Sequence, residues 1–354
     1  MDGFVCAEKS LVSSERFSES SGGAFVSPGG TPVSSEEARH TPVLVKEVVD
    51  FLRLGPSNLP EGPGSPGRIY LDATLGGGGH AEAILRASAP TGRLIGLDRD
   101  REAVEAARER LSEYHDRTIL VQEHFARMAD VLTQHHLQQV DGIVFDLGIS
   151  LRQLRAANRG FSFQLDGPLD MRMNQDQLLT AEMLIQRLSK KELAEIIFRY
   201  GEDRRANRIA NAIEHARRKQ PIKTTRQLVE IILRAVPRGR SDSRLHPATR
   251  TFQALRIAVN QELDHLETAL EAACGLLNLG GRLCVIAFHS LEDRIVKQVF
   301  RRLSGHGIGH GSGREKSALM EILTRKPIRP SPAEVQENPR SRSARLRVAE
   351  RIGG

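Results

Sequence analysis

The chain has 354 residues, of which 27% are charged and 39% hydrophobic, a composition that fits a globular protein of about two domains. No apolar run approaches the ~20 residues needed to span a bilayer, so we expect no membrane partner. The three cysteines, Cys6, Cys274 and Cys284, lack CxxC spacing, which excludes a disulfide framework and a thiolate zinc site and indicates a reducing cytoplasm.

The net charge of +7 is concentrated in the middle of the chain. Residues 151–258 carry 22 Lys and Arg against 11 Asp and Glu, so the rest of the chain is net −4. Solvated helical faces often carry such charge without a function, but a surplus confined to one segment is also the footprint of phosphate-backbone contact. The segment is therefore a candidate nucleic-acid surface.

In chain order, residues 1–38 are rich in Ser, Gly and Pro and are predicted to form a disordered tail. A short helix within 40–52 and a Pro/Gly linker over 56–67 follow. Apolar strands then alternate with helical segments, which predicts a parallel α/β sheet covered on both faces. The predicted strands are 69–74, 93–98, 118–121 and 142–147, and the helices between them are 80–88, 101–111 and 126–136.

After residue 150 the alternation gives way to helical patterns around 193–200, 209–216 and 228–235, each with apolar residues at i, i+3 and i+4. We therefore predict a basic helical substrate-binding domain over 151–258, inserted into a Rossmann-like domain of residues 39–150 and 259–354. The latter resumes with one long helix from Val259 to Leu277, stopped at Gly280-Gly281, and a strand over 282–288. Residues 321–328 and 344–349 are predicted to form an antiparallel edge pair.

The glycine run Gly76-Gly77-Gly78-Gly79 stands directly after the first predicted strand. Glycines there permit a tight turn and let a ligand lie against bare amides, and the next helix directs unpaired N–H groups at the same place. Asp98 ends the second strand, where an open α/β sheet places a carboxylate for ribose hydroxyls. These features predict an adenosine-containing cofactor. Gly76-x-Gly78-x-x-Ala81 also satisfies the loose dinucleotide fingerprint, which leaves NAD as a competitor.

A series of sequence blocks resembles the bacterial MraW/RsmH type of ribosomal RNA methyltransferase, in that family's order from His40 to about Arg351. The longer blocks are highly specific. They include His40-Thr41-Pro42-Val43-Leu44, Asp72-x-Thr74-x-Gly76-x-Gly78-Gly79-His80, Asp98-Arg99-Asp100, Asp146-Leu147-Gly148-Ile149-Ser150, Arg159-Gly160-Phe161-Ser162-Phe163, Asp166-Gly167-Pro168-Leu169-Asp170-Met171-Arg172-Met173, His246-Pro247-Ala248-Thr249-Arg250-Thr251-Phe252-Gln253 and Phe288-His289-Ser290-Leu291-Glu292-Asp293-Arg294.

The resemblance implies a class I methyltransferase fold with a helical insert and S-adenosylmethionine as cofactor. It also implies N4-methylation of a cytidine at the decoding site of small-subunit (16S) rRNA, with the rRNA or the assembled small subunit as partner. It places the cofactor on Gly78, Gly79, His80, Asp98, Phe125, Asp146 and Gln153. Phe125 would cover the adenine face, and His80 fits a ligand contact and a helix cap equally well.

For catalysis we favour Asp146 and Ser150, whose oxygens would accept the hydrogens of the cytosine amine, with His289 and Ser290 behind them. The alternative is that Asp146 serves only the cofactor. The family carries a second Ser after Ser150 and an acid near position 155, whereas this chain has Leu151 and Arg155, which puts the geometry around Gln153 in doubt. Phosphate contacts are predicted for Arg159, Arg172, Arg204, Arg205, Arg217, Arg218, Arg250 and Arg256.

No metal site is predicted, because the two histidines in the 305–313 loop have no carboxylate or thiolate in phase. Two other functions remain open. The altered 151–155 stretch favours an RNA-binding assembly factor that keeps the cofactor pocket without turnover, and the Gly76/Gly78/Ala81 spacing favours an NAD(P)-linked oxidoreductase. The sequence does not decide between a monomer and a homodimer.

Overall fold

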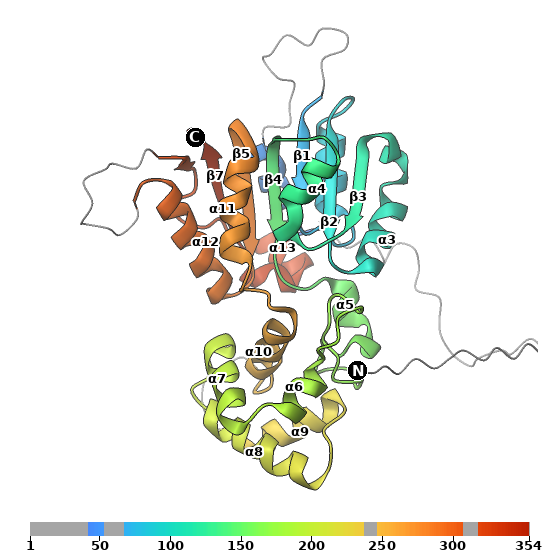
Figure 1. Ribbon diagram of the computed structural model, residues 1–354, viewed down its shortest axis with the longest axis vertical. Helices are drawn as coiled ribbons and strands as arrows, with labels where there is room; N and C mark the ends of the chain where they lie inside the picture. Colours follow the sequence, from blue (N-terminus) through green and yellow to red (C-terminus); the bar gives the residue numbers. More distant parts are fainter. Residues whose placement is uncertain (1–41, 53–66, 237–245, 307–317, 354) are drawn as a thin grey trace, which may run out of the picture. The chain divides into compact units, whose positions relative to one another are not determined.

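A computed structural model describes residues 42–52, 67–236, 246–306 and 318–353. The predicted tail, most of the 56–67 linker and most of the 305–313 loop lie outside these residues. The described strands form one seven-stranded sheet in the order β3-β2-β1-β4-β5-β7-β6 (Figure 1). They are β1 Ile69–Asp72, β2 Arg93–Asp98, β3 Thr118–Gln122, β4 Val140–Asp146, β5 Leu277–Ala287, β6 Met320–Ile322 and β7 Arg345–Arg351.

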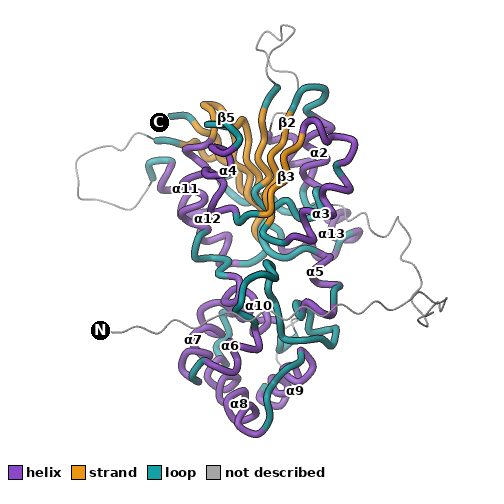
Figure 2. The backbone as a smooth tube through the Cα atoms, turned by 45° about the vertical axis from the view of Figure 1, so that its right-hand side comes forward, coloured by secondary structure: helices purple, strands orange, loops and turns teal. Residues whose placement is uncertain are grey.

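Strands β1 to β5 are parallel, and β7 is antiparallel to both of its neighbours, β5 and β6. Figure 2 shows α2 and α3 on one side of the sheet and α4, α11 and α12 on the other. The bounds of the helices around the sheet are α1 Val45–Leu52, α2 Gly79–Ala87, α3 Arg101–Arg110, α4 Met128–Gln134, α11 Leu266–Leu276 and α12 Ser290–Leu303. The doubly covered sheet confirms the predicted fold class.

Each parallel strand contributes to two hydrophobic cores because successive side chains point to opposite faces. Tyr70 and Val144 belong to the core under α1, α2 and α3, whereas Leu71 and Ile143 belong to the core under α4, α11 and α12. Strands buried on both faces therefore read as continuous apolar runs, which is why their positions were predictable from the sequence.

Between β4 and α11 the chain forms a helical insert, by which we mean residues 151–260, with a hydrophobic core of its own between Phe161 and Val259. The structure confirms the three predicted helical patterns as α7, α8 and α9. The division at residues 151 and 258 stays a prediction, because both ends of the insert contact the sheet loops. The helices are α5 Leu151–Arg155, α6 Ala181–Arg187, α7 Lys190–Gly201, α8 Ala206–Lys219, α9 Thr225–Ala235 and α10 Thr249–Asn260.

The predicted long helix from Val259 to Leu277 is wrong. Helix α10 ends at Asn260, Gln261 adopts a left-handed conformation with φ 50°, and α11 begins only at Leu266. The chain is already extended at Leu277, so Gly280-Gly281 lies inside β5 instead of ending a helix.

The antiparallel pair predicted near the end of the chain is confirmed as β6 and β7, although β6 is only three residues long. A short helix, α13 Pro332–Glu337, occupies the loop between them, where only a polar connection was expected. None of the helices in the described ranges is long and apolar enough to cross a membrane.

Candidate functional site

The carboxyl ends of β1, β2 and β4 bring three acidic side chains, Asp72, Asp98 and Asp146, to one edge of the sheet. The strand ends are fastened to one another, since the Thr74 hydroxyl accepts a hydrogen bond from the Asp146 amide at 2.5 Å. This edge lies on the side of the sheet where the helical insert is attached (Figure 1). Open α/β sheets bind their ligands at this edge.

The glycine loop turns sharply above this edge, with φ 50° at Gly76 and 77° at Gly78. A Cβ on Gly78 would lie 3.2 Å from the Ala107 side chain, and one on Gly79 would lie 2.7 Å from Pro42. The α-hydrogen that a side chain would replace therefore faces protein at Gly78 and at Gly79, and the ligand contact of these two residues stays a prediction. A Cβ on Gly77, in contrast, would meet nothing within 4 Å.

Helix α2 begins at this loop without a side-chain cap, because its N-cap residue is Gly78. The first amides of a helix have no intrahelical acceptor, and they carry the positive end of the helix dipole. The loop therefore offers backbone donors to an anionic group, which is the role that the sequence assigned to it.

Asp98 is held in place by two backbone amides. Its Oδ2 accepts from the Gly76 amide and its Oδ1 from the Asp100 amide, both at 2.8 Å. Burial raises the pKa of Asp98 to about 6, although both amides lower it. Each carboxylate oxygen retains a further lone pair, so Asp98 can still accept from ribose hydroxyls.

His80 lies in the first turn of α2 and is buried, with 5% of its surface exposed. Its Nε2 lies 2.9 Å from the Val43 carbonyl oxygen, and its Nδ1 lies 3.6 Å from Asp146 Oδ2. Burial lowers the pKa of His80, so the ring is neutral at physiological pH. Its ring thus ties α2 to the segment before α1 instead of capping the helix, and the ligand contact of His80 stays a prediction.

Asp146 has 26% of its side chain open to solvent, whereas Asp72 is fully buried. Desolvation, followed by the nearby Glu292 carboxylate, raises the pKa of Asp146 to about 7. Burial likewise raises the pKa of Asp72 to about 7. Among the residues that the structure describes, neither Asp146 Oδ1 nor Asp72 Oδ2 has a hydrogen-bond partner, so each is a buried acceptor available to a ligand.

Phe125 begins the short helical turn η2, Phe125–Arg127, after β3. Its half-buried ring packs edge-on against Phe145, with 5.7 Å between ring centroids. A cavity of about 380 Å³ opens beside it, lined by Arg99 and His124 and, from the helical insert, by Asn260. Phe125 and the other predicted cofactor residues do not line this cavity, so the contact of Phe125 with the adenine stays a prediction.

Ser150 and Gln153 form a capping box at the start of α5. The Ser150 hydroxyl accepts from the Gln153 amide, and Gln153 Oε1 accepts from the Ser150 amide at 3.0 Å. Leu151 and Arg155, where this chain departs from the family pattern, do not prevent this arrangement. Gln153 Nε2 donates to Asp100 at 2.7 Å, so the side chain is engaged within the protein at both ends. We predicted a direct cofactor contact for Gln153, whereas its observed contacts are those of a residue that positions the Ser150 loop.

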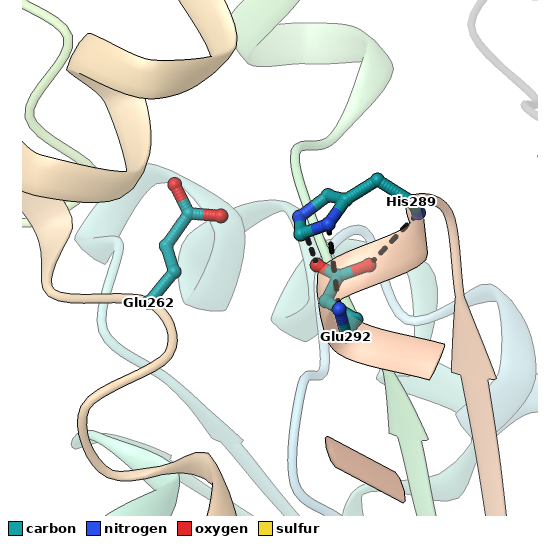
Figure 3. A group of neighbouring side chains, drawn as sticks. All are labelled: Glu262, His289 and Glu292. Atoms are coloured by element: carbon teal, nitrogen blue, oxygen red, sulfur yellow. Dashed lines mark hydrogen bonds and ion pairs between the residues drawn. The ribbon is translucent and has the colours of Figure 1, made fainter. Parts of the chain in front are cut away.

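Near Asp146, two ionisable side chains at the N-terminus of α12, His289 and Glu292, lie close to Glu262 from the turn after α10 (Figure 3). Their ligand atoms lie within 4.8 Å of one another, which would suit a metal ion. However, Arg256 binds both carboxylate oxygens of Glu262 at 2.8 Å. Glu292 accepts from the Phe288 amide and pairs with His289 at 3.1 Å. The negative charges are compensated by the protein itself, so we assign no metal.

Comparison with known proteins places the chain in a family. The sequence profile described as the MraW methylase family matches residues 37–352. The chain belongs to the MraW methylase family. Proteins named ribosomal RNA small subunit methyltransferase H are similar to this methylase: that of Geotalea uraniireducens is 52% identical over 317 residues, covering 88% of this chain and 98% of the relative. That of Geobacter sulfurreducens is 49% identical over 320 residues, covering 88% and 99%.

Among solved structures, an rRNA methylase from Streptococcus thermophilus is similar to this MraW methylase at a TM-score of 0.37 and 11% identity, covering 89% of this chain and 98% of that one. At that TM-score the likeness carries no argument. Membership of a methylase family with this sheet makes S-adenosylmethionine the cofactor and overturns the alternative of an NAD(P)-linked oxidoreductase.

The residues of this MraW methylase fit that cofactor. The uncapped amides of α2 suit its carboxylate, and Asp98 suits its ribose hydroxyls. The oxygens of Asp72 and Asp146 that lack a partner among the described residues would be acceptors for its ammonium group or for substrate hydrogens. The open face at Gly77 leaves the loop accessible. The assignments to individual residues stay predictions.

The eight predicted phosphate contacts differ in burial, and two of them, Arg172 and Arg217, are half-buried and donate to backbone carbonyl oxygens. The prediction is wrong for Arg159, which is 1% exposed and ion-paired with Asp100 at 2.8 Å. Arg256 is mostly buried against Glu262. The exposed members that remain candidates are Arg204, Arg205, Arg218 and Arg250.

The sequence analysis did not identify Asp100 or Glu292, which hold neighbouring residues of the site in place. A signal was present for Asp100, because it ends the Asp98-Arg99-Asp100 motif and stands where an N-cap is expected. No local signal could have paired it with Arg159, 59 residues further along the chain.

Proposed function

We propose that this MraW methylase transfers a methyl group to the N4 atom of a cytidine at the decoding site of small-subunit rRNA. One observation carries the proposal: Asp146, whose buried Oδ1 has no partner among the described residues, ends β4 directly before the helical insert, and its Oδ2 lies 3.6 Å from His80 at the start of α2. The names of the similar proteins support small-subunit rRNA as the substrate.

When bound, S-adenosylmethionine supplies an electrophilic methyl group. The acceptor amine of cytosine is a poor nucleophile, because its lone pair is delocalised into the ring. Oxygen acceptors that bind the two amine hydrogens would localise that pair. Asp146 offers a carboxylate for one hydrogen, and the Ser150 hydroxyl oxygen is the candidate for the other.

Asp146 is also suited to take the proton that the amine releases. A general base works best when its pKa lies near the working pH, and the pKa of about 7 meets that condition. His289 and Ser290 are weaker candidates for this role, because His289 pairs with Glu292 and the Ser290 hydroxyl donates to Glu202 of the insert. We therefore propose Asp146 and Ser150 as the catalytic residues.

The base must leave any helical stack to reach this pocket, so the insert would hold the flanking RNA. Exposed arginines such as Arg204 and Arg250 would contact phosphates. We place the reaction in the cytoplasm, on free rRNA or on the assembled small subunit.

The non-catalytic alternative, an assembly factor that retains the pocket, was favoured only by Leu151 and Arg155. Helix α5 keeps a complete capping box with both residues present, so this argument loses its structural basis.

The test is nucleoside mass spectrometry of small-subunit rRNA from a strain that lacks the gene. We expect N4-methylated cytidine to disappear from the decoding region, to return with the wild-type gene, and to stay absent with an Asp146→Asn variant that binds S-adenosylhomocysteine normally. Unchanged N4-methylation in the deletion strain would refute the proposal.

A further inference from the structure

Asp100 is a buried carboxylate that the proposed reaction does not use. It is 2% exposed and caps α3 by accepting from the Glu102 amide at 3.1 Å. Its own amide donates to Asp98 Oδ1 at 2.8 Å. Any displacement of Asp100 would therefore move a donor of the carboxylate that is predicted to hold the cofactor ribose.

The side chain of Asp100 is held by residues of the helical insert. Its Oδ2 accepts from Arg159 Nη2 at 2.8 Å and from Gln153 Nε2 at 2.7 Å. Gln153 in turn holds the Ser150 amide through its Oε1. One carboxylate thus links the turn after Asp98 to the predicted catalytic loop and to the helical insert.

Arg159 fastens the insert at this point. Besides Asp100, its guanidinium donates to the carbonyl oxygens of Met173 at 3.0 Å and Arg172 at 3.1 Å, and to Glu102 Oε2 at 2.8 Å. A buried guanidinium is stable only while its acceptors stay in place. The segment at Arg172 and Met173 therefore cannot move away from α3 without breaking this cluster.

A second set of hydrogen bonds joins the insert to the same turn, the one after Asp98. Arg99, which lies between Asp98 and Asp100, donates to the Asn260 carbonyl oxygen at 2.7 Å and to Gln177 Oε1 at 3.0 Å. Arg99 and Asn260 also line the cavity beside Phe125. The insert therefore contributes to the wall of this cavity and is hydrogen-bonded directly to the turn after Asp98.

We infer that the Asp100–Arg159 pair couples the cofactor site to the RNA-binding insert, so that each ligand tightens the binding of the other. The inference rests on the proposed function. A ligand on Asp98 would restrain the Asp100 amide, and through Asp100 and Arg159 that restraint would reach the insert, so that RNA would bind an insert that has already lost part of its freedom. The effect is reciprocal by thermodynamic linkage. Asp100 and Arg159 are positioning residues that act through Asp98 and Ser150.

The test measures the dissociation constant of tritiated S-adenosylhomocysteine by equilibrium dialysis, alone and with saturating small ribosomal subunits from a strain lacking the gene. For the wild type we expect the subunits to lower the constant by about fivefold or more, the usual range for coupled sites. For Arg159→Lys, which keeps the charge but cannot reach Asp100, Glu102 and both carbonyls together, we expect a ratio near one.

Glu350→Gln is the matched control. Glu350 pairs with the buried Arg282 at 2.8 Å, but this pair joins β5 and β7 within the sheet and includes no residue of the insert. It should keep the wild-type ratio. If Arg159 served folding alone, Arg159→Lys would lower Tm and weaken the affinities for S-adenosylhomocysteine and for the subunits. The ratio of the dissociation constants measured without and with subunits would then stay at the wild-type value.

Arg99→Met is a second variant, in case Arg159→Lys does not fold. It removes both donors to the insert from a half-buried side chain, and the ratio should fall again. A wild-type ratio of one, or a wild-type ratio retained in the folded variants, would overturn the coupling alone. If the wild type bound neither S-adenosylhomocysteine nor subunits, the proposed function would fail, and the coupling with it.

Discussion

Replacing Asp98 by Asn tests the geometry of the proposed cofactor site most directly. The amide keeps the shape of the side chain but loses the charge and one of its two acceptor oxygens. In the wild type, the backbone amides of Gly76 and Asp100 each donate to one carboxylate oxygen of Asp98, so one of these amides loses its acceptor in the variant. The ribose would at the same time lose a charge-assisted hydrogen bond.

A hydrogen bond to a charged group contributes about 1.5 to 3 kcal/mol. Since ~1.4 kcal/mol corresponds to a factor of ten, the dissociation constant of S-adenosylhomocysteine should rise about 10- to 150-fold. Calorimetry should be carried out near pH 8, because the pKa of Asp98 is about 6 and the carboxylate is then ionised in the wild type.

The matched control is Asp141→Asn. Asp141 also accepts a backbone amide, that of Ile69 at 2.8 Å, but it lies at the start of β4, at the opposite edge of the sheet. Its substitution should leave the dissociation constant unchanged, and a thermal melt of both variants would show that they are folded. If Asp98→Asn bound the ligand as tightly as the wild type, the assignment of the ribose to Asp98 would be refuted.

Three further predictions concern catalysis, packing and RNA binding. Because only ionised Asp146 can accept a proton and its pKa is raised to about 7, single-turnover methyl transfer should slow as the pH falls below 7; a rate independent of pH from 6 to 8 would contradict its role as base. Gly79→Ala forces a Cβ to 2.7 Å from Pro42 and should lower the free energy of unfolding by about 1 to 3 kcal/mol in denaturant titrations, whereas Gly77→Ala, with nothing within 4 Å, should not; equal losses would disprove this packing argument. Arg204→Ala should weaken subunit binding and reduce the slope of log affinity against log salt by about one, and an unchanged slope would exclude a phosphate contact there.

The elements around the cofactor loop were determined by the sequence itself. Strand β2 was predicted with its observed bounds, Arg93–Asp98, because a strand buried on both faces needs a continuous apolar run. The turn at Gly76 and the acid at Asp98 were also identifiable, since a tight turn requires glycine and the end of a strand requires no distant partner to define it.

Only the tertiary structure decided which partner each polar side chain takes. Apolar spacing continued across the break at Gln261, because both flanking helices bury residues in phase, and the pattern alone therefore suggested one helix. Arg159 looked like a phosphate ligand until its contacts with Asp100 showed it to be an internal ion pair, and the hydrogen bonds of Gln153 to Asp100 and to the Ser150 amide were not predictable from the sequence. The local spacing of apolar and polar residues determines which backbone conformation has the lowest free energy. Whether a charged side chain is buried or exposed is decided only when segments far apart in the chain pack together.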